Sequence, residues 1–526
     1  MPLALFSVAL LALPWLWPFT SGPTAAVQPY LIAVAAAALL LVVSTRQSAN
    51  AMARAAALGW LVAALLSSLI ALLQYFDAEA PFHPWLNSAV PGLGFGNLRQ
   101  PNQLATLLVI GLMALRWWEQ QGAARPGAVR SVWRTAAAGC LLAGLAASAS
   151  RIGLVEMAAV CAAALVWAQR AGRGWRPTLR WVLLLAALYV AAALALPLLL
   201  EASEGIAGRN MLDRLQHAES TCGSRLILWS NVLDLIRQKP WAGWGWGELA
   251  YAHYITLYDG PRFCHILDNA HNLPLHLAVE LGVPVAVLVC GLTAYLVWRG
   301  RPWAEQDPTR QLAWGVLLAI GLHSLVEYPL WYGPFQIAVA LCFWLLSDKK
   351  PYPASAGSYQ EQSKEMADAP AEGRWRHAVA ALMLAVVAYA GWDYHRISQV
   401  YLPYEQRSAW YQGDAMGHAK RSWLFAGAVR FAEVTTRPAT RDNAAWMLPE
   451  ALRALHFSPE TRVITKVIES ATLLGQDDLA VRHLARFKAA FPAEYQQWVD
   501  DNRRMLEGAQ QQARDAPAPA ASTVSG

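Results

Sequence analysis

The chain has 526 residues, of which 56% are hydrophobic and only 15% are charged, and its formal net charge is +6. Soluble proteins carry about 25% charged residues, because their surface must be hydrated. The composition therefore excludes an ordinary soluble protein. Together with a mean hydropathy of +0.27, it predicts an all-α polytopic membrane protein.

Long apolar runs recur along the chain, among them LIAVAAAALLLVV and VAVLVCGLTAYLVW. A helix of about 20 such residues crosses a hydrocarbon core of about 30 Å. The N-terminal run LALFSVALLALPWLWPF lacks a basic leader and an A-x-A cleavage site, so we interpret it as a membrane span and not as a signal peptide. We expect about eleven spans, at roughly 3–20, 28–45, 55–75, 102–116, 135–150, 152–169, 181–200, 272–298, 311–327, 333–347 and 377–394.

Basic residues occupy every second loop between these spans. Arginines and lysines gather at 46–54, 116–134, 170–180, 299–310 and 349–376. The positive-inside rule assigns such loops to the cytoplasmic side. The net positive charge therefore reflects topology, and we expect no nucleic-acid partner. The loops on the outer side lie at about 76–101, 150–151, 201–271 and 327–334, together with everything after about 395.

This topology divides the chain into membrane parts and outer parts. After the last span, apolar residues recur at i, i+3, i+4 and i+7, which predicts a soluble helical domain. That pattern fits a docking surface for a partner and a helical cap without a binding role equally well. We expect N-terminal transmembrane helices at 1–200, an outer catalytic segment at 201–271, C-terminal transmembrane helices at 272–394, an outer helical domain at 395–510 and a disordered tail at 511–526.

The six cysteines form two groups. Cys140, Cys161, Cys290 and Cys342 fall in apolar spans, where a thiol behaves as a small hydrophobe. Cys222 and Cys264 both lie in the long outer segment, and we expect them to form a disulfide in an oxidising compartment. The chain has no C-x-x-C and no H-E-x-x-H spacing, so we expect no metal site and no cofactor.

Polar side chains gather at the outer ends of the spans. They are Arg99, Gln100, Asn102 and Gln103 in NLRQPNQLATLL, Arg151 in SASRIGLVE, Arg225 in GSRLILWS, His271 in AHNLPLHLAVELG, and His323, Glu327, Tyr328 and Tyr332 in GLHSLVEYPLWY. An arginine binds phosphate oxygens bidentately and stays charged. An imidazole titrates near neutrality and can accept a proton from a hydroxyl. Such cations and a base at headgroup depth fit transfer from a lipid-linked pyrophosphate.

Several of these segments resemble a known superfamily. SRIGLVE, SRLILW, PWAGWGWG and HNLPLHLAVELG resemble the shared region of the O-antigen ligases and polymerases. LRQPNQLAT and HSLVEYPLWY are similar to the bacterial protein O-oligosaccharyltransferases of the pilin-glycosylating (PglL) type. The resemblance runs through most of residues 90–335. It implies a metal-independent glycosyltransferase of the bacterial inner membrane, with many helices and an active site that faces the periplasm.

The same resemblance implies the substrates and the site residues. Glycan would pass from undecaprenyl-pyrophosphate to Ser or Thr of a periplasmic acceptor protein such as pilin, with membrane lipid around the enzyme. The residues that carry the family's functional pattern are His271 and one of Tyr328 and Tyr332 as catalytic groups, and Gln100, Arg151 and Arg225 as substrate-binding groups, with Gln103 as a further binding candidate beside Gln100.

The substrate-binding candidates have structural alternatives. Arg151 could anchor a helix end by snorkelling to the membrane surface. Arg225 could pair with Asp234 or Glu248. Gln100 could cap the helix that begins at the following proline.

The histidines differ in what their positions predict. His276 and Glu280 are four residues apart on one helical face, and we expect this pair to be structural. We expect His323 to be structural as well. His271 stands at a loop-to-helix start, where flanking asparagines can orient its ring, and we favour a role as general base there.

Two other functions compete with protein glycosylation. A lipid A–core O-antigen ligase or a repeat-unit polymerase shares the superfamily, but RQPNQ and the outer helical domain favour a protein acceptor. A lipid-linked glycan transporter would bury ionisable residues near the bilayer midplane at the junction of repeated halves. The spans are nearly free of charge at their centres and show no internal repeat, which makes transport the weaker hypothesis.

Overall fold

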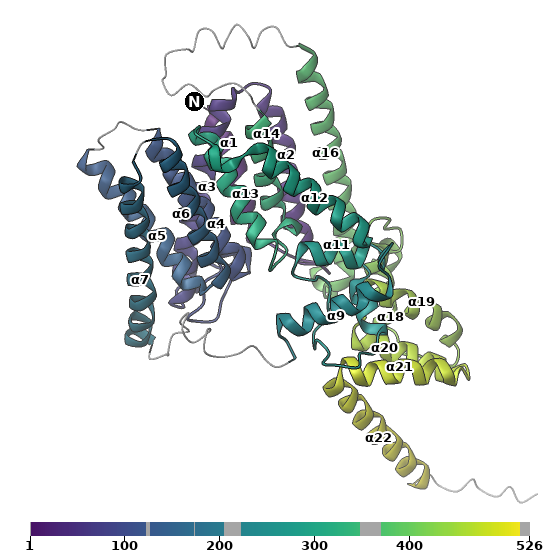
Figure 1. Ribbon diagram of the computed structural model, residues 1–526. Helices are drawn as coiled ribbons and strands as arrows, with labels where there is room; N and C mark the ends of the chain where they lie inside the picture. Colours follow the sequence, from purple (N-terminus) through teal and green to yellow (C-terminus); the bar gives the residue numbers. More distant parts are fainter. Residues whose placement is uncertain (1, 122–126, 173, 205–221, 348–369, 516–526) are drawn as a thin grey trace, which may run out of the picture. The chain divides into compact units, whose positions relative to one another are not determined.

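The computed structural model describes residues 2–121, 127–172, 174–204, 222–347 and 370–515. Within these ranges the regular secondary structure is entirely helical, as the composition predicts (Figure 1). The chain forms two compact units. The first unit comprises residues 1–219, 270–277 and 284–425, and the second comprises residues 220–269, 278–283 and 426–526.

The first unit contains most of the apolar helices. They are α1 (Pro2–Leu16), α2 (Val27–Ser44), α3 (Ala49–Tyr75), α4 (Pro101–Gln120), α5 (Ala128–Ser148), α6 (Arg151–Arg170), α7 (Arg176–Glu204), α12 (Val283–Gly300), α13 (Pro308–His323), α14 (Gly333–Ser347) and α16 (Pro370–Ser398). The short helix α17 (Ala415–Ala419) and the 3-10 turns η1 (Ala80–Phe82), η2 (Gly96–Leu98), η3 (Pro302–Ala304), η4 (Pro329–Trp331), η6 (Gln399–Tyr401), η7 (Tyr404–Gln406) and η8 (Ala409–Tyr411) connect and follow them.

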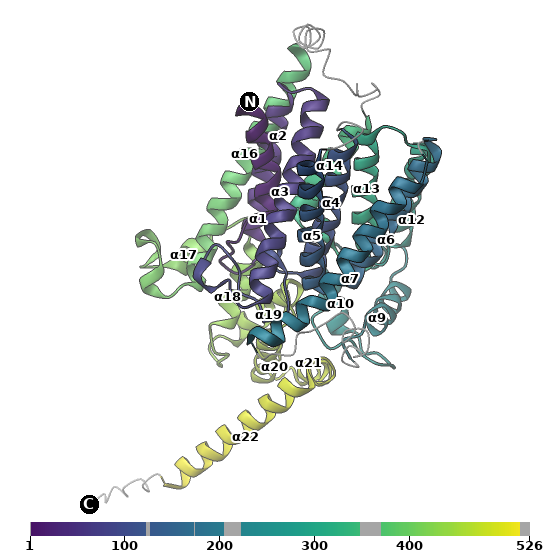
Figure 2. The same cartoon turned by 90° about the vertical axis from the view of Figure 1, so that its left-hand side faces the viewer.

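Helix α4 lies at the centre of the first unit. Every residue from Gln103 to Trp117 is buried, and α4 packs against α3, α5, α6 and α13 (Figure 2). Small residues permit this close packing: a Cβ at Gly111 would collide with the Cβ of Ala64 on α3. A helix that is apolar all round is expected in a core. The packing fixes the N-terminus of α4, where several of the expected site residues lie.

Six of the described helices are long and apolar enough to cross a membrane. They are Val27–Ser44, Ala49–Tyr75, Arg151–Arg170, Arg176–Ala202, Val283–Ala304 and Gly373–Tyr401. Exposed leucines such as Leu198 on α7 and Leu288 on α12 point away from the protein core, as lipid-facing residues do. The chain is therefore a helical membrane protein. The count of eleven spans and their sidedness stay predictions.

The single span expected at 272–298 is wrong, because two helices occupy this stretch. Helix α11 runs from Leu273 to Leu281, and α12 begins at Val283. The break is at Gly282, which has a φ of +89° that residues with a Cβ rarely adopt. A Cβ at Gly282 would also collide with the backbone carbonyl of Trp241. Helix α11 therefore ends where Gly282 meets the backbone of Trp241 and Ala242, the first two residues of WAGWGWG.

The second unit is a helical domain with its own core. Its helices are α9 (Arg225–Gln238), α10 (Leu249–Ile255), α18 (Ala426–Thr435), α19 (Ala444–Phe457), α20 (Thr461–Leu473), α21 (Asp477–Ala490) and α22 (Pro492–Asp515). Tyr254 of α10 is buried among side chains of α19, α20 and α21, and its hydroxyl lies 2.8 Å from Nδ1 of His483. Helix α10 and the C-terminal helices α19, α20 and α21 thus share one core. The expected tail at 511–526 lies outside the described residues from 516 onward.

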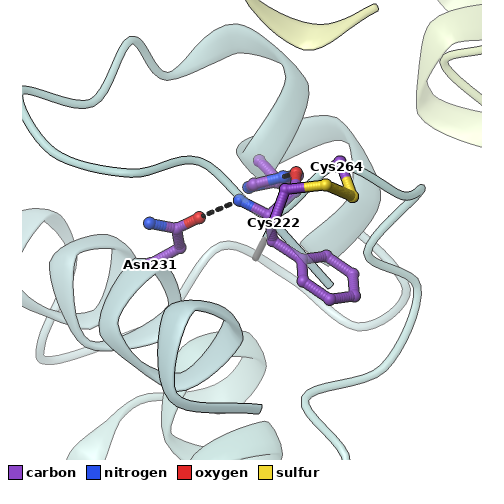
Figure 3. The surroundings of a disulfide bond; sticks show 5 residues. Cys222, Asn231 and Cys264 are labelled. Atoms are coloured by element: carbon purple, nitrogen blue, oxygen red, sulfur yellow. Dashed lines mark hydrogen bonds between the residues drawn. A yellow bond between two sulfur atoms is a disulfide. The ribbon is translucent and has the colours of Figure 1, made fainter. Parts of the chain in front are cut away.

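Cys222 and Cys264 are joined by a disulfide in the second unit (Figure 3). Asn231 of α9 holds the chain beside it: its side-chain oxygen accepts the N–H of Phe263 at 2.9 Å, and its amide donates to the carbonyl of Pro261 at 3.0 Å. The hydrogen bonds of Asn231 therefore tie the loop before Cys264 to α9, and the disulfide ties Cys264 itself to Cys222, which precedes that helix.

Candidate active site

His271 occupies a strained position at the start of α11. Its φ is +48°, an uncommon value for a residue with a Cβ and one that often marks functional sites. The next residue, Asn272, begins the helix: its side-chain oxygen accepts the N–H of Leu275 at 3.0 Å, and its amide donates to the carbonyl of Leu325 at 2.9 Å. The backbone N–H of Leu273 donates to the carbonyl of Ser324 at 2.8 Å. The loop that carries His271 is thus fixed to the segment after α13.

The imidazole of His271 is paired with a buried carboxylate. Its Nδ1 lies 2.7 Å from Oε2 of Glu327, and the side chains are 19% and 6% exposed. The ring of Tyr328 meets the imidazole edge to face, with centroids 4.9 Å apart. A carboxylate on one ring nitrogen fixes the orientation of the ring and the tautomer. When Nδ1 carries the hydrogen, the lone pair that accepts a proton is on Nε2.

Asn102, in the first turn of α4, connects Glu327 to the turn before α6. Its amide nitrogen donates to Oε1 of Glu327 at 3.3 Å, so the two carboxylate oxygens have different partners. Its amide oxygen accepts the hydroxyl of Ser150 at 2.8 Å. Ser150 is the N-cap of α6 and also accepts the N–H of Gly153 at 3.3 Å. The carboxylate of Glu327 is therefore linked directly to His271 before α11 and, through Asn102, to the N-termini of α4 and α6.

A second polar cluster lies one turn further along α4. The hydroxyl of Thr106 lies 3.1 Å from the carbonyl of Asn102, 2.9 Å from Oε1 of Glu156 and 2.7 Å from Nδ1 of His323. All three side chains of Thr106, Glu156 and His323 are fully buried. The expected structural role of His323 agrees with this position, because it joins α13 to α4 and α6. Polar groups buried in a helical bundle specify how its helices pack.

Gln100 is the N-cap of α4. Its side-chain oxygen accepts the N–H of Gln103 at 2.7 Å, and Pro101 occupies the first helical position, where its missing N–H costs nothing. The capping alternative for Gln100 is thus what the structure contains. Gln103 is buried, and its side-chain oxygen has no hydrogen-bond partner among the described residues. An unpaired buried acceptor of this kind can receive a donor group of a substrate.

Arg151 and Arg225 have the same local environment in the two units. Each is the first residue of a helix, α6 or α9, and each follows a serine N-cap. A cation is disfavoured at the positive end of a helix by roughly 0.3–1 kcal/mol, whereas an anion is favoured there. Arg151 is exposed and Arg225 is half-buried. Both arginines therefore lie at helix ends that favour an anion.

Asp234 and Glu248, the carboxylates with which Arg225 could form an ion pair, each contact another residue. Asp234 forms an ion pair with Arg237, and Glu248 lies 2.7 Å from Nδ1 of His456.

Tyr328 and Tyr332 flank the 3-10 turn η4, directly after Glu327. Their rings are stacked with centroids 6.0 Å apart, and the ring of Tyr328 contacts that of His271. Tyr332 packs against the apolar core of the first unit. Tyr328 is therefore brought into contact with the histidine.

His276 has partners of its own in the first unit. Its Nδ1 lies 3.4 Å from the N–H of Ala270, and its ring meets that of Trp331 edge to face at 4.9 Å. The side chain is 2% exposed. These contacts fit the expected structural role, since they hold the loop before α11 to η4.

The WAGWGWG segment caps the C-terminus of α11 within the second unit. The N–H groups of Trp244 and Gly245 each donate at 2.9 Å, to the carbonyls of Val279 and Glu280. Gly243 has a φ of +69°, and a Cβ there would collide with the carbonyl of Glu280. The carboxylate of Glu280 accepts hydrogen bonds from the N–H groups of Gly247 and Leu249. Gly243 is thus required by a close backbone contact.

The sequence alone assigns no role in the His271 network to Asn102, Ser150 or Glu327. Asn102 and Glu327 carry a signal, because both stand in the polar stretches at the outer ends of spans. Ser150 carries a weaker one, as the residue before Arg151. Their roles follow from hydrogen bonds to residues 48 and more positions away, which no local pattern encodes.

Three protein families match successive parts of this chain. A family described as "Protein glycosylation ligase" matches residues 95–118, one described as "O-Antigen ligase" matches 136–290, and one described as "Virulence factor membrane-bound polymerase, C-terminal" matches 311–505. The three matches contain, respectively, Gln100 with Gln103, then Arg151, Arg225 and His271, then Tyr328 with Tyr332.

Two proteins of Acinetobacter baylyi are similar to this chain. Its "General O-oligosaccharyltransferase" is 26% identical over 293 residues, which are 55% of this chain and 49% of that protein. Its "ComP-specific O-oligosaccharyltransferase" is 23% identical over 293 residues, which are 54% of this chain and 50% of that protein. The matched part thus spans about half the length of these relatives. The resemblance to the O-antigen ligase superfamily and to protein O-oligosaccharyltransferases is confirmed.

Proposed function

We propose that this protein is a protein O-oligosaccharyltransferase of the bacterial inner membrane. It transfers an oligosaccharide from undecaprenyl-pyrophosphate to a Ser or Thr hydroxyl of a periplasmic protein such as pilin. The observation that carries this proposal is the pairing of His271 with the buried Glu327. The names of the two Acinetobacter relatives support the reaction class.

The histidine supplies the proton acceptor that the reaction needs. The acceptor oxygen forms a bond to the anomeric carbon of the first sugar, while the bond from that carbon to the pyrophosphate oxygen breaks. The pyrophosphate leaves with the electron pair, and the hydroxyl proton passes to Nε2 of His271. A positioned general base contributes roughly 10²–10⁴-fold to such a step.

Glu327 stabilises the state in which His271 is most effective. Its carboxylate accepts the Nδ1–H, which leaves Nε2 as the base, and it stabilises the imidazolium that forms after proton transfer. Asn102 occupies the other carboxylate oxygen and prevents the carboxylate from turning away. The histidine is regenerated when the proton is released to water.

The arginines bind the leaving group. Arg151 at the start of α6 combines a guanidinium with the N-terminus of a helix, and both favour a phosphate. Arg225 at the start of α9 has the same combination within the second unit, and we propose that it binds a phosphate there. Charge that develops on the departing pyrophosphate is then offset by fixed positive groups. Gln103 offers an unpaired amide oxygen for a donor group of the substrate.

An O-antigen ligase that uses lipid A–core as the acceptor is the alternative, and the match of residues 136–290 favours it to the same degree as glycosylation. Both functions use the same donor and the same base. They differ in the acceptor, and the match of residues 95–118 to protein glycosylation ligases favours protein.

Co-expression with a lipid-linked glycan pathway and a candidate pilin separates the two functions. Protein glycosylation predicts that mass spectrometry of the purified pilin finds the glycan mass on a Ser or Thr peptide. Glycan on lipid A–core, with unmodified pilin and unmodified periplasmic proteins, would identify a ligase instead.

A further inference from the structure

A cavity of about 460 Å³ lies in the first unit, between the beginning of α2 and the end of α16. The two helices run side by side (Figure 2). None of the residues discussed for the His271 site lines this cavity. Small-molecule pockets typically measure about 300–1,000 Å³, so the cavity has the size of a ligand site.

One wall of the cavity is the segment before α2, which is fixed to α16 through Tyr394. The Tyr394 hydroxyl lies 2.6 Å and 2.7 Å from the carbonyls of Ser21 and Thr24 and accepts the N–H of Thr24 at 3.0 Å. Gln28, at the start of α2, donates to the hydroxyl of Ser21 at 2.6 Å. This wall therefore keeps its shape without a ligand.

The opposite wall is the segment after α16, which folds back onto that helix. The side-chain oxygen of Gln399 accepts the N–H of Ser408 at 2.8 Å, and the hydroxyl of Ser408 lies 3.3 Å from Nε2 of His395. Gln406 lines the same wall and is exposed. The cavity is thus preformed on both sides and open to the solvent.

The lining offers amides, hydroxyls and the imidazole of His395. Three glutamines and three serines line it, and no Asp, Glu, Lys or Arg does so among the described residues. The nearby ion pair of Asp393 and Arg396 is directed elsewhere, because Asp393 also accepts the hydroxyl of Ser422 at 3.0 Å. A phosphate or a carboxylate ligand would require cations that this lining lacks.

Amides and hydroxyls both donate and accept hydrogen bonds, so they match a ligand whose groups do the same. Sugar hydroxyls have this property, and the half-buried Leu31 and Leu402 in the lining supply apolar surface for the C–H groups of a sugar. We propose that this cavity is a binding site for an uncharged saccharide, separate from the residues that carry out transfer. The proposal does not rest on the proposed function, since binding requires no reaction.

The position of the cavity fits this ligand. The basic residues Arg374 and Arg376 lie near the beginning of α16, and the cavity lies at the end of that helix. By the positive-inside rule, the cavity opens on the outer side of the membrane. Saccharides that are built on a lipid carrier or attached to exported proteins are present on that side.

Saturation-transfer NMR on the full-length protein in phospholipid nanodiscs tests the proposal, because nanodiscs avoid detergents with sugar headgroups. The probes are N,N′-diacetylchitobiose, maltose and glycerophosphoethanolamine, the last as a mimic of a lipid headgroup. The double variant Gln28→Leu/Gln406→Leu removes two amides from the lining. Gln496→Leu on the exposed face of α22 is the matched control.

We expect saturable binding of at least one disaccharide to the wild type and to Gln496→Leu. The double variant should bind it about thirtyfold more weakly, since each of the two lost neutral hydrogen bonds costs about 1 kcal/mol. His271→Ala should bind it as the wild type does, even when transfer is lost, which keeps this test independent of the reaction. Absence of binding by both disaccharides, equal affinities in the double variant, or saturable binding of glycerophosphoethanolamine alone would overturn the proposal.

Discussion

Nδ1 of His271 lies 2.7 Å from Oε2 of Glu327, although the two residues are 56 positions apart in the chain. The loop before α11 and the segment after α13 meet at this contact. The backbone N–H of Leu273 and the side-chain amide of Asn272 donate hydrogen bonds that hold them together. A histidine at a loop-to-helix start thus becomes an oriented base only through a residue from another part of the chain. The first predictions test this relationship.

Replacement of Glu327 by Gln should lower the rate of transfer on the order of 10²-fold, with little change in the KM for the lipid-linked donor. The amide keeps the size of the side chain but cannot stabilise the imidazolium. Single-turnover transfer in vesicles with a saturating donor measures this effect. Glu305→Gln, which breaks the ion pair with Arg310 near the start of α13, is the matched control and should keep the wild-type rate. A Glu327→Gln enzyme as fast as this control would remove Glu327 from the mechanism.

Replacement of Asn102 by Ala should lower kcat about tenfold, because a hydrogen bond to a carboxylate contributes about 1.5–3 kcal/mol. Without it, Glu327 retains His271 as a partner but loses the bond that fixes its second oxygen. Gln120→Ala at the other end of α4 breaks a hydrogen bond to Gln311 and serves as the control. The kcat and the KM should be measured separately. An effect confined to the KM would mean that Asn102 binds substrate and does not position Glu327.

Arg151→Lys and Arg225→Lys should each raise the KM for the donor about tenfold, because an ammonium cannot make the bidentate contact of a guanidinium. Lysine keeps the positive charge in both variants, so a higher KM would reflect the loss of the bidentate contact and not the loss of charge. Transfer at limiting lipid-linked donor measures it. If both variants work at the wild-type rate under these conditions, the two arginines only anchor their helices at the membrane surface.

Acid should destabilise the second unit through His253. Burial, with a contribution from the Arg262 charge, lowers the pKa of His253 from its ordinary value of 6.5 to about 3, and the ring contacts Tyr258 and the Phe263 carbonyl. The unfolded state therefore binds the proton first, and stability falls as the pH drops below 6.5. The loss should reach about 2 kcal/mol at pH 5 for this one group.

Hydrogen exchange of peptides that cover residues 249–265, corrected for intrinsic exchange rates, measures this loss. In His253→Gln the free energy of opening should depend less on pH between 7 and 5 than in the wild type, by about the same 2 kcal/mol. Equal pH dependence in the two proteins would show that His253 does not titrate on opening.

Local patterns predict much of the helical architecture. Pro101 after a capping residue, and a serine before Arg151 and before Arg225, mark helix starts that the structure contains. The apolar runs that cross a membrane also stand out, because a span of suitable length needs little tertiary information. These features depend on residues within one or two turns of each other.

Other features depend on contacts between distant segments. The break at Gly282 was not predicted, because apolar residues continue across it and the cause is the backbone of Trp241. The link from Thr106 to Glu156 and His323 joins three helices, and no periodicity reveals such a link. The same holds for Glu327, which is visible as a polar residue in the sequence and gains its role from His271 and Asn102.

The central claim is that His271 is the base of a transfer reaction to protein. Its most direct test is the intact mass of a purified acceptor after incubation with lipid-linked glycan and the protein in vesicles, for the wild type and for His271→Ala. The wild type should add one glycan mass to the acceptor. His271→Ala should insert and bind the donor but slow the addition by roughly 10²–10⁴-fold, while His276→Ala should lose less. Addition by His271→Ala at the wild-type rate with limiting enzyme would contradict the account and make Tyr328 the better candidate.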